Sequence, residues 1–196
     1  MSKKFLILLF LIPFQLMFAQ KSLLKDFPEG YTPKEIGKRI AYRFLTEKHA
    51  LHVGKWIGYP ETFYWSGALR YADGAKDKEL IQRLQEKFDF LFTEEKILQP
   101  IMNHVDLNMF GSLPLEFYLV TKDLKYRYLG LPYADSQWEL PRNAKPHEKE
   151  WAEKGYSWQT RLWIDDMYMI TIVQTRAYKV TKDKKYIDRA AKEMVM

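Results

Sequence analysis

A six-residue pattern that occurs twice in this chain limits how the chain can fold. Thr-Lys-Asp-Leu-Lys-Tyr occupies residues 121–126, and Thr-Lys-Asp-Lys-Lys-Tyr occupies residues 181–186, which is 60 positions later. A looser copy, Ala-Lys-Asp-Lys-Glu-Leu, occupies residues 75–80. Each copy separates two stretches with apolar residues at helical spacing, so we interpret it as a tight turn whose aspartate caps the second helix. Such a pattern is typical of stacked pairs of antiparallel helices.

The stretches between these turns favour helices along most of the chain. Thr-Pro-Lys-Glu at residues 32–35 has the form of a capping box with proline at the first helical position. About seven helices are predicted from apolar spacing. They are expected from residue 32, at 61–74, at 78–91, at 103–119, after Asp123, at 161–180 and at 184–196. Residues 139–158 are polar and contain two prolines, so they are predicted to form a long loop.

These elements predict the fold class. No segment alternates apolar and polar residues as a strand would, so we expect an all-α protein. Stacked helical hairpins with short turns on one side and long loops on the other fit an (α/α) barrel or a helical solenoid.

The repeat also aligns two acidic residues. Asp106 lies 17 residues before the turn residue Asp123, and Asp165 lies 18 residues before Asp183. Both carboxylates are therefore expected at the starts of equivalent helices, at the same end of the stack. In the first hairpin this offset falls just ahead of Tyr64. We predict that three helix starts and the loops before them surround one mouth.

Residues 162–169, Leu-Trp-Ile-Asp-Asp-Met-Tyr-Met, are apolar or aromatic at nearly every position except Asp165 and Asp166. An aspartate in the first turn of a helix suits the helix dipole. A carboxylate among apolar residues is nevertheless costly unless it has a function. Asp166 points about 100° around the helix from Asp165, so we interpret it as a cap or an ion-pair residue.

The same stretch resembles the W-x-D-x-[LM]-[FY]-M segment of unsaturated uronyl hydrolases, glycoside hydrolase families 88 and 105. The residues that match this segment are Trp163, Asp165, Met167, Tyr168 and Met169. The resemblance implies that Asp165 is the catalytic acid and base. A second aspartate supports the first in these families, and His-Val-Asp at residues 104–106 is similar to that segment, which implies this role for Asp106.

The resemblance further implies a reaction and a substrate class. The expected substrates are oligosaccharides whose terminal uronate carries a C4=C5 double bond left by a polysaccharide lyase. An aspartate would protonate C4 of this vinyl ether and water would add at C5. Pectin-derived rhamnogalacturonan is the expected polymer, with glycosaminoglycan and algal fragments as alternatives. No metal, cofactor or nucleophilic serine or cysteine is expected to take part.

Aromatic residues are candidates for binding sugar. The aromatic content of 16% is high, and sugars stack on such rings. Besides His104, which is expected to hold the uronate or orient Asp106, the substrate-binding candidates are Tyr64, Trp65, Trp158, Trp163 and Tyr168, with Trp151 as a further ring from the long loop. The absence of cysteine excludes disulfides and thiolate metal sites, and His104 with Asp106 lacks a third ligand at sensible spacing.

Residues 1–20 have the pattern of a signal peptide. Two lysines precede an apolar run that Pro13 interrupts, and Ala19 precedes a plausible cleavage point. The mature protein is thus expected to be periplasmic or secreted, and free of the membrane after cleavage. Its lysines are dispersed among acidic residues, so we do not expect it to bind nucleic acid.

Two other classes of protein fit the same pattern. One is an exported helical-repeat protein that binds glycans or a partner without catalysis, and the other is another (α/α)-barrel enzyme such as a polysaccharide lyase. The resembling families close a ring of six helical hairpins, whereas the helices predicted here are fewer. We therefore expect residues 21–196 to be the N-terminal part of a longer barrel, from a truncated or split reading frame.

Overall fold

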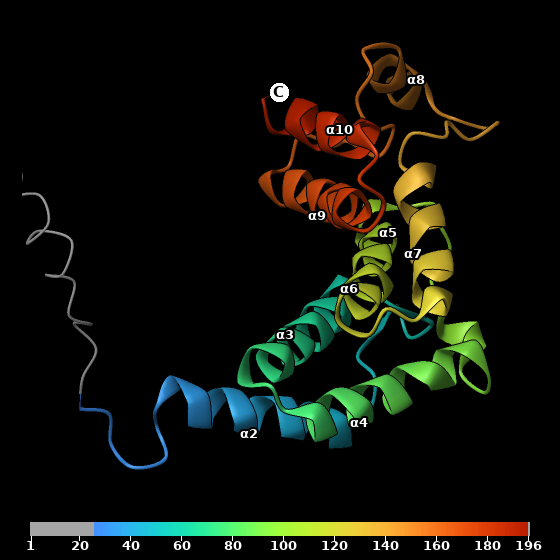
Figure 1. Ribbon diagram of the computed structural model, residues 1–196. Coiled ribbons are helices and arrows are strands. Elements are labelled where there is room, and N and C mark those ends of the chain that lie inside the picture. The colour runs from blue at the N-terminus through green and yellow to red at the C-terminus, as the bar shows by residue number, and fades with distance from the viewer. Residues whose placement is uncertain (1–25, 196) are drawn as a thin grey trace, which may run out of the picture. The chain divides into compact units, whose positions relative to one another are not determined.

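The computed structural model describes residues 26–195, and the signal peptide predicted at residues 1–20 lies outside them (Figure 1). Of the described residues, 26–36 belong to one compact unit and 37–195 belong to a second. The described helices are α2 (Pro33–Thr46), α3 (Tyr59–Ala75), α4 (Lys78–Asp89), α5 (Val105–Asn108), α6 (Ser112–Thr121), α7 (Leu124–Ser136), α8 (Pro146–Glu153), α9 (Ile164–Thr181) and α10 (Lys184–Met194). Short 3-10 turns lie at Phe90–Phe92, Lys96–Leu98 and Met109–Gly111. None of the helices within residues 26–195 is both long and apolar enough to cross a membrane.

In the N-terminal unit the predicted capping box is present. The side-chain oxygen of Thr32 accepts the backbone N–H of Glu35 at 3.2 Å, and the Glu35 carboxylate accepts the backbone N–H of Thr32 at 3.0 Å. The two residues thereby satisfy N–H groups that a helix start otherwise leaves unpaired.

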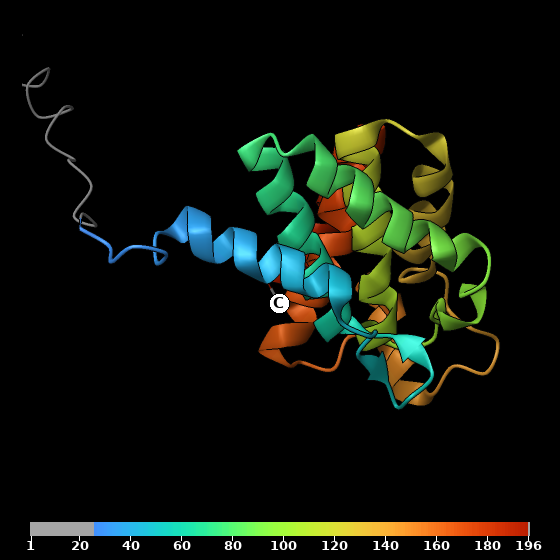
Figure 2. The same cartoon turned by 90° about the horizontal axis from the view of Figure 1, so that it is seen from below.

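The unit from Gly37 onward consists of stacked helical hairpins, so the all-α prediction is confirmed. The pairs α3–α4, α6–α7 and α9–α10 each pack as antiparallel neighbours, and α6 packs between α3 and α9 (Figure 1). The inner helices are therefore α3, α6 and α9, and the outer helices α4, α7 and α10 lie behind them. A two-stranded antiparallel hairpin, β1 (Leu51–His52) and β2 (Trp56–Ile57), connects α2 to α3 (Figure 2).

The two strict copies of the repeat have nearly the same geometry. Asp123 and Asp183 each accept the backbone N–H two residues later at 3.0 Å, so both cap the helix that follows. Asp77 of the looser copy accepts the N–H three residues later at 3.0 Å. Lys122 and Lys182 adopt left-handed backbone angles, with φ of 66° and 63°, and end the inner helices. The predicted capped turns are thus confirmed.

Each of the two strict copies is also joined to the preceding outer helix. The Tyr126 hydroxyl donates a hydrogen bond to Asp89 at 2.8 Å, and the lysine before this tyrosine bonds the same carboxylate at 2.9 Å. In the next hairpin the Tyr186 hydroxyl donates to Asp135 at 3.1 Å, and its preceding lysine lies 3.3 Å from that carboxylate. Asp89 and Asp135 each lie twelve residues after the capping aspartate of their own hairpin, so the contact repeats in the same register.

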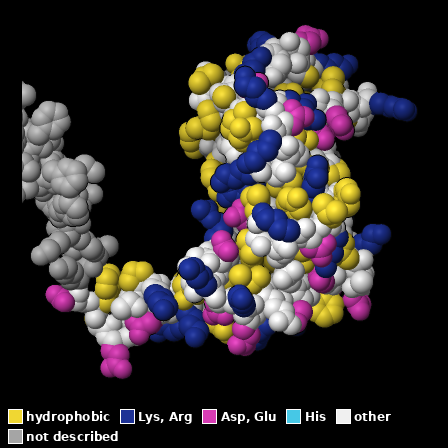
Figure 3. All heavy atoms as spheres, in the orientation of Figure 1, with side chains coloured by type: hydrophobic (Ala, Val, Ile, Leu, Met, Phe, Trp, Pro, Cys, Tyr) yellow, Lys and Arg dark blue, Asp and Glu magenta, His cyan; other side chains and the backbone are white. Residues whose placement is uncertain are grey.

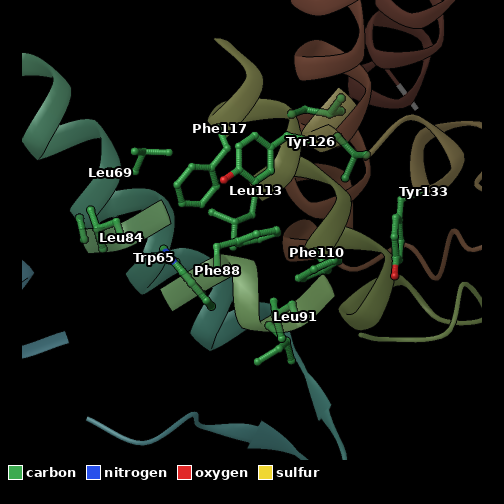
Figure 4. Close-up of a cluster of buried hydrophobic side chains, with 14 of the residues drawn as sticks. Trp65, Leu69, Leu84, Phe88, Leu91, Phe110, Leu113, Phe117, Tyr126 and Tyr133 are labelled. Atoms are coloured by element: carbon green, nitrogen blue, oxygen red, sulfur yellow. The ribbon is translucent and has the colours of Figure 1, made fainter. Parts of the chain in front are cut away.

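Large aromatic side chains fill the space between the inner and outer helices (Figure 4). Phe88 of α4 lies at the centre, with ring-centroid distances of 4.9 Å to Phe117 and 5.5 Å to Tyr126. Trp65 joins the cluster 5.2 Å from Phe88 and is completely buried. Much of the high aromatic content therefore stabilises the core, because these rings bury large apolar areas.

Two features differ from the predicted elements. The predicted loop at 139–158 contains helix α8, which begins where the backbone N–H of Lys145 donates to Glu148 at 2.7 Å. All side chains of α8 are at least partly exposed, so no apolar stripe signals this helix in the sequence. The predicted helix at 103–119 is divided between α5, a 3-10 turn and α6.

Candidate active site

The starts of α5 and α9 lie next to each other and form the candidate site. His104 caps α5, where its Nδ1 accepts the backbone N–H of Asp106 at 3.2 Å. Helix α5 packs against α9, whose first turn carries Asp165 and Asp166. The helix starts that the repeat aligns in the sequence are therefore at the same end of the stack.

Arg161 joins the two helix starts. Its Nε–H donates to the Asp166 carboxylate at 2.8 Å, and its Nη2 donates to Asp106 at 3.2 Å. Its Nη1 lies 3.2 Å from the Nε2 atom of His104, and the Trp163 ring packs over the guanidinium at 4.7 Å. A planar guanidinium with several donors suits such a junction, since it can bind two carboxylates at once.

The two aspartates in the first turn of α9 have different surroundings. Asp166 is buried, with 1% of its surface exposed, and pairs with Arg161. The interpretation of Asp166 as an ion-pair residue is thus confirmed. The Asp165 side chain is exposed, and no hydrogen bond or ion pair to it occurs within residues 26–195. Of the two carboxylates, Asp165 is the one that is accessible to an incoming molecule.

Burial lowers the pKa of His104 below its usual value. The Asp106 carboxylate acts against this effect, while the positive charge of Arg161 and the neighbouring His52 lower the pKa further. The imidazole is therefore neutral at neutral pH. His52 belongs to strand β1, so the hairpin between α2 and α3 lies close enough to affect this site electrostatically.

Exposed apolar side chains surround this end of α9. On the face seen in Figure 3, yellow side chains gather over the start of α9 and the end of α10. The large apolar residues exposed in these segments are Leu162, Trp163, Ile164, Tyr168, Met194 and Val195. The Tyr168 ring stacks on Phe63 of α3 with a centroid distance of 5.6 Å. Tyr168 lies one helical turn after Asp165, so its ring is on the same side of α9.

A groove beside the Phe63–Tyr168 pair contains Tyr64. Its volume is about 410 Å³, and its lining residues are Ile40, Tyr59, Pro60, Phe63, Tyr64, Gly67 and Ala68. The Tyr64 side chain is exposed. Phe63 both lines this groove and stacks on Tyr168, so one wall of the groove is in contact with α9.

Two predicted sugar-binding rings belong to the interior instead. Trp65 is completely buried, and His49 and Phe88 cover its ring. Trp158 is 7% exposed, and its indole N–H donates to the backbone oxygen of Ser136 at 2.7 Å. Neither ring has a free face on which a sugar could stack, so these two expectations are corrected. Trp151 is half-buried on α8 and packs edge-to-face against Tyr156 at 5.8 Å.

Sequence reasoning missed Arg161, whose partners are distant in the chain. Asp106 lies 55 residues away from it, and no local pattern predicts that contact. Sequence reasoning also missed a partly buried network formed by the segment before β1. There the imidazole of His49 lies 2.7 Å from Glu61 and 3.1 Å from Glu95. Within residues 26–195 no cluster of three or more potential metal-ligating side chains is found.

The helical hairpins and the paired acidic helix starts define a class of all-α protein with a polar site at one end of the stack. The chain matches the family model described as Glycosyl Hydrolase Family 88 over residues 33–196, and it belongs to that family. It is therefore a glycosidase by family, and its substrate is a carbohydrate. No curated protein and no solved structure matched the chain in the other two comparisons.

Proposed function

We propose that this protein hydrolyses oligosaccharides that end in an unsaturated uronic acid, with Asp165 as the acid and base. The observation that supports this proposal is the contrast between Asp165, which is exposed and unpaired among the described residues, and Asp106, which is engaged by Arg161. An accessible carboxyl group can transfer protons to a substrate. A carboxylate held by arginine instead provides a fixed negative charge beside the reacting atoms.

The reaction begins with proton transfer from the Asp165 carboxyl group to C4 of the sugar. The double-bond electrons form the new C4–H bond, and the positive charge is shared by C5 and the ring oxygen. Water then adds at C5 while the Asp165 carboxylate takes its proton, which restores the acid. The resulting hemiketal opens between C5 and the ring oxygen. C1 is then a hemiacetal that collapses to an aldehyde and releases the neighbouring sugar.

Three aromatic side chains are positioned to bind the substrate in this proposal. Trp163 and Tyr168 are exposed on either side of Asp165 in the chain, and Tyr64 lines the adjoining groove. Their rings can stack on the apolar faces of sugars. His104 accepts the backbone N–H of Asp106 at Nδ1 and lies beside Arg161 at Nε2, so in this proposal it orients Asp106.

The source of the substrate and the location of the protein are further parts of this proposal. We propose pectin-derived rhamnogalacturonan as the polymer, since the family resemblance favours it, and export to the periplasm or the medium. The pattern of two lysines followed by an apolar run in residues 1–20 supports export.

The experiment that tests the function compares Asp165→Asn with the wild-type protein. Loss of the ultraviolet absorbance of the unsaturated uronate is followed on lyase-digested pectin, ulvan and chondroitin. Asparagine keeps the shape of the side chain but cannot donate the proton, so we expect kcat to fall roughly 10²- to 10⁴-fold. The unfolding midpoint should stay unchanged because Asp165 is exposed.

Asp188→Asn provides the matched control, since Asp188 is also an exposed aspartate on a helix and, among the described residues, pairs only with Lys184 one turn earlier. It should retain wild-type turnover. Wild-type turnover by the Asp165 variant would reject the role of Asp165, and no turnover of any of these substrates by the wild-type protein would reject the proposed function.

A further inference from the structure

A single carboxylate in α10 holds both ends of the segment that leads into the candidate site. Glu193 is completely buried. One of its carboxylate oxygens accepts the backbone N–H of Ser157 at 2.6 Å, and the other accepts the Thr160 hydroxyl at 3.1 Å. The carboxylate therefore fixes residues 157–160 at their first and last positions.

The other contacts of this segment are made with the end of α7. The Ser157 hydroxyl donates to the backbone oxygen of Gln137 at 2.9 Å, and the Trp158 indole donates to that of Ser136 at 2.7 Å. All four residues of the segment 157–160 are buried. The segment is thus part of the buried interior, although it connects two helices.

Arg161 directly follows residue 160, so the contacts that hold residues 157–160 also fix the position of the Arg161 backbone. The Arg161 guanidinium then binds Asp106 and Asp166 at the starts of α5 and α9. A small displacement of residues 157–160 would move Arg161 away from both carboxylates. Positioning errors of about 1 Å at a reacting group can reduce an enzyme's rate roughly 100-fold.

The cost of burying Glu193 also suggests a role beyond stability. Burial raises the pKa of its carboxyl group, while the hydrogen bonds from Ser157 and Thr160 oppose that shift. The neighbouring Lys192 does not pair with this carboxylate but donates to the backbone oxygen of Lys154. A buried carboxylate is expensive, and an apolar side chain would fill the same space at lower cost.

We propose that Glu193 is a positioning residue for the active site. It sets the location of Arg161 and the start of α9, and through them the orientation of Asp106 and Asp165. The part of this inference that concerns catalysis rests on the proposed function above.

The test compares three substitutions at Glu193 with one control on the same helix. Glu193→Gln keeps an acceptor for the Ser157 N–H and should retain kcat within about threefold. Glu193→Ala removes both contacts and should lower kcat roughly 10- to 100-fold with little change in KM. Glu193→Asp is too short to reach both ends and should give an intermediate loss.

Tyr186→Phe is the control, because it removes a hydrogen bond between α10 and Asp135 without touching residues 157–160. It should lower the melting temperature but leave kcat unchanged. If Glu193→Ala does not fold, Glu193→Asp decides the question. Wild-type kcat in the folded alanine or aspartate variant would overturn the proposal, as would an equal loss of kcat in Tyr186→Phe.

A second readout does not depend on turnover. The Nε–H of a paired arginine gives a distinct NMR signal, and Arg161→Lys identifies the signal that belongs to Arg161. We expect Glu193→Ala to shift or broaden this signal and Tyr186→Phe to leave it unchanged. An unchanged signal in Glu193→Ala would overturn the positioning role. If the wild-type protein has no turnover but the signal responds to Glu193→Ala, the proposed function fails and the positioning role remains.

Discussion

The contacts of successive helical hairpins are the same at one end of the stack and differ at the other. At the end formed by the turns 121–126 and 181–186, called here the turn end, successive hairpins have the same caps, the same left-handed lysine and the same tyrosine–aspartate contact. At the end formed by the starts of α5 and α9, called here the site end, equivalent aspartates have different surroundings. Asp106 is held by Arg161, and Asp165 is exposed.

This difference distinguishes the end of the repeat that serves the architecture from the end that carries the candidate site. The turn end repeats because each hairpin must bury its apolar faces against its neighbour in the same way. Under the proposed function, the site end departs from the repeat because a proton donor and its supporting carboxylate need different environments. A position at which equivalent residues of a repeat have different surroundings is therefore a candidate functional position.

The largest effect on stability is expected at the site end, from Arg161→Gln. This change leaves the buried Asp166 carboxylate without its cation, and breaking such a pair costs about 3 kcal/mol. It should also reduce turnover, since Asp106 loses a partner. Urea unfolding measures the stability change.

Arg70→Gln is the control for this prediction. Arg70 is exposed and lies 4.0 Å from Glu116, so its loss should cost less than about 1 kcal/mol. Equal destabilisation by the two arginine substitutions would show that the Arg161 junction contributes no more than an ordinary surface pair.

A smaller effect is expected at the turn end. Asp123→Ala and Asp183→Ala each remove a helix cap, so each should cost about 1 kcal/mol. The two values should agree, and the double variant should show their sum because the sites share no partner. Turnover should be unaffected in all three variants. Clearly unequal costs, or a loss of kcat in either single variant, would contradict the separation of the two ends.

The smallest effect concerns pH. Because the pKa of His104 is lowered by folding, the unfolded chain takes up this proton at higher pH than the folded one. Stability is therefore fully present above about pH 6.5 and decreases as the pH falls below that value, by less than about 1 kcal/mol for this partly exposed group.

His104→Asn keeps a residue that caps helices well and removes the titration. Its unfolding free energy should depend less on pH between 5 and 7 than that of the wild-type protein. Identical pH profiles for the two proteins would mean that His104 titrates alike in the folded and unfolded chains.

Features that depend on nearby residues in the chain could be predicted from the sequence. The capping aspartates Asp77, Asp123 and Asp183 act on N–H groups two or three residues away, so their pattern predicts the turns. The alignment of Asp106 with Asp165 follows from the same repeat. Helix α8 escaped prediction because it has no buried face.

Features that depend on packing between distant segments could not be predicted. The sequence around Trp65 does not show that His49 and Phe88 will cover the ring. The role of Arg161 depends on Asp106, which is 55 residues away. The sequence does contain one further signal of this packing. Asp89 and Asp135 each lie twelve residues after the capping aspartate of their own hairpin.

The contacts of Asp89 and Asp135 have a consequence for how the molecule opens. The carboxylate near the end of α4 binds Tyr126 of α7, and the carboxylate near the end of α7 binds Tyr186 of α10. Through these contacts, each outer helix is linked to the next one along the stack. Local unfolding of α7 breaks both links, whereas unfolding of α10 breaks only one. Thermal opening is then a nearest-neighbour process, in which backbone amides of adjacent hairpins lose their protection from exchange together.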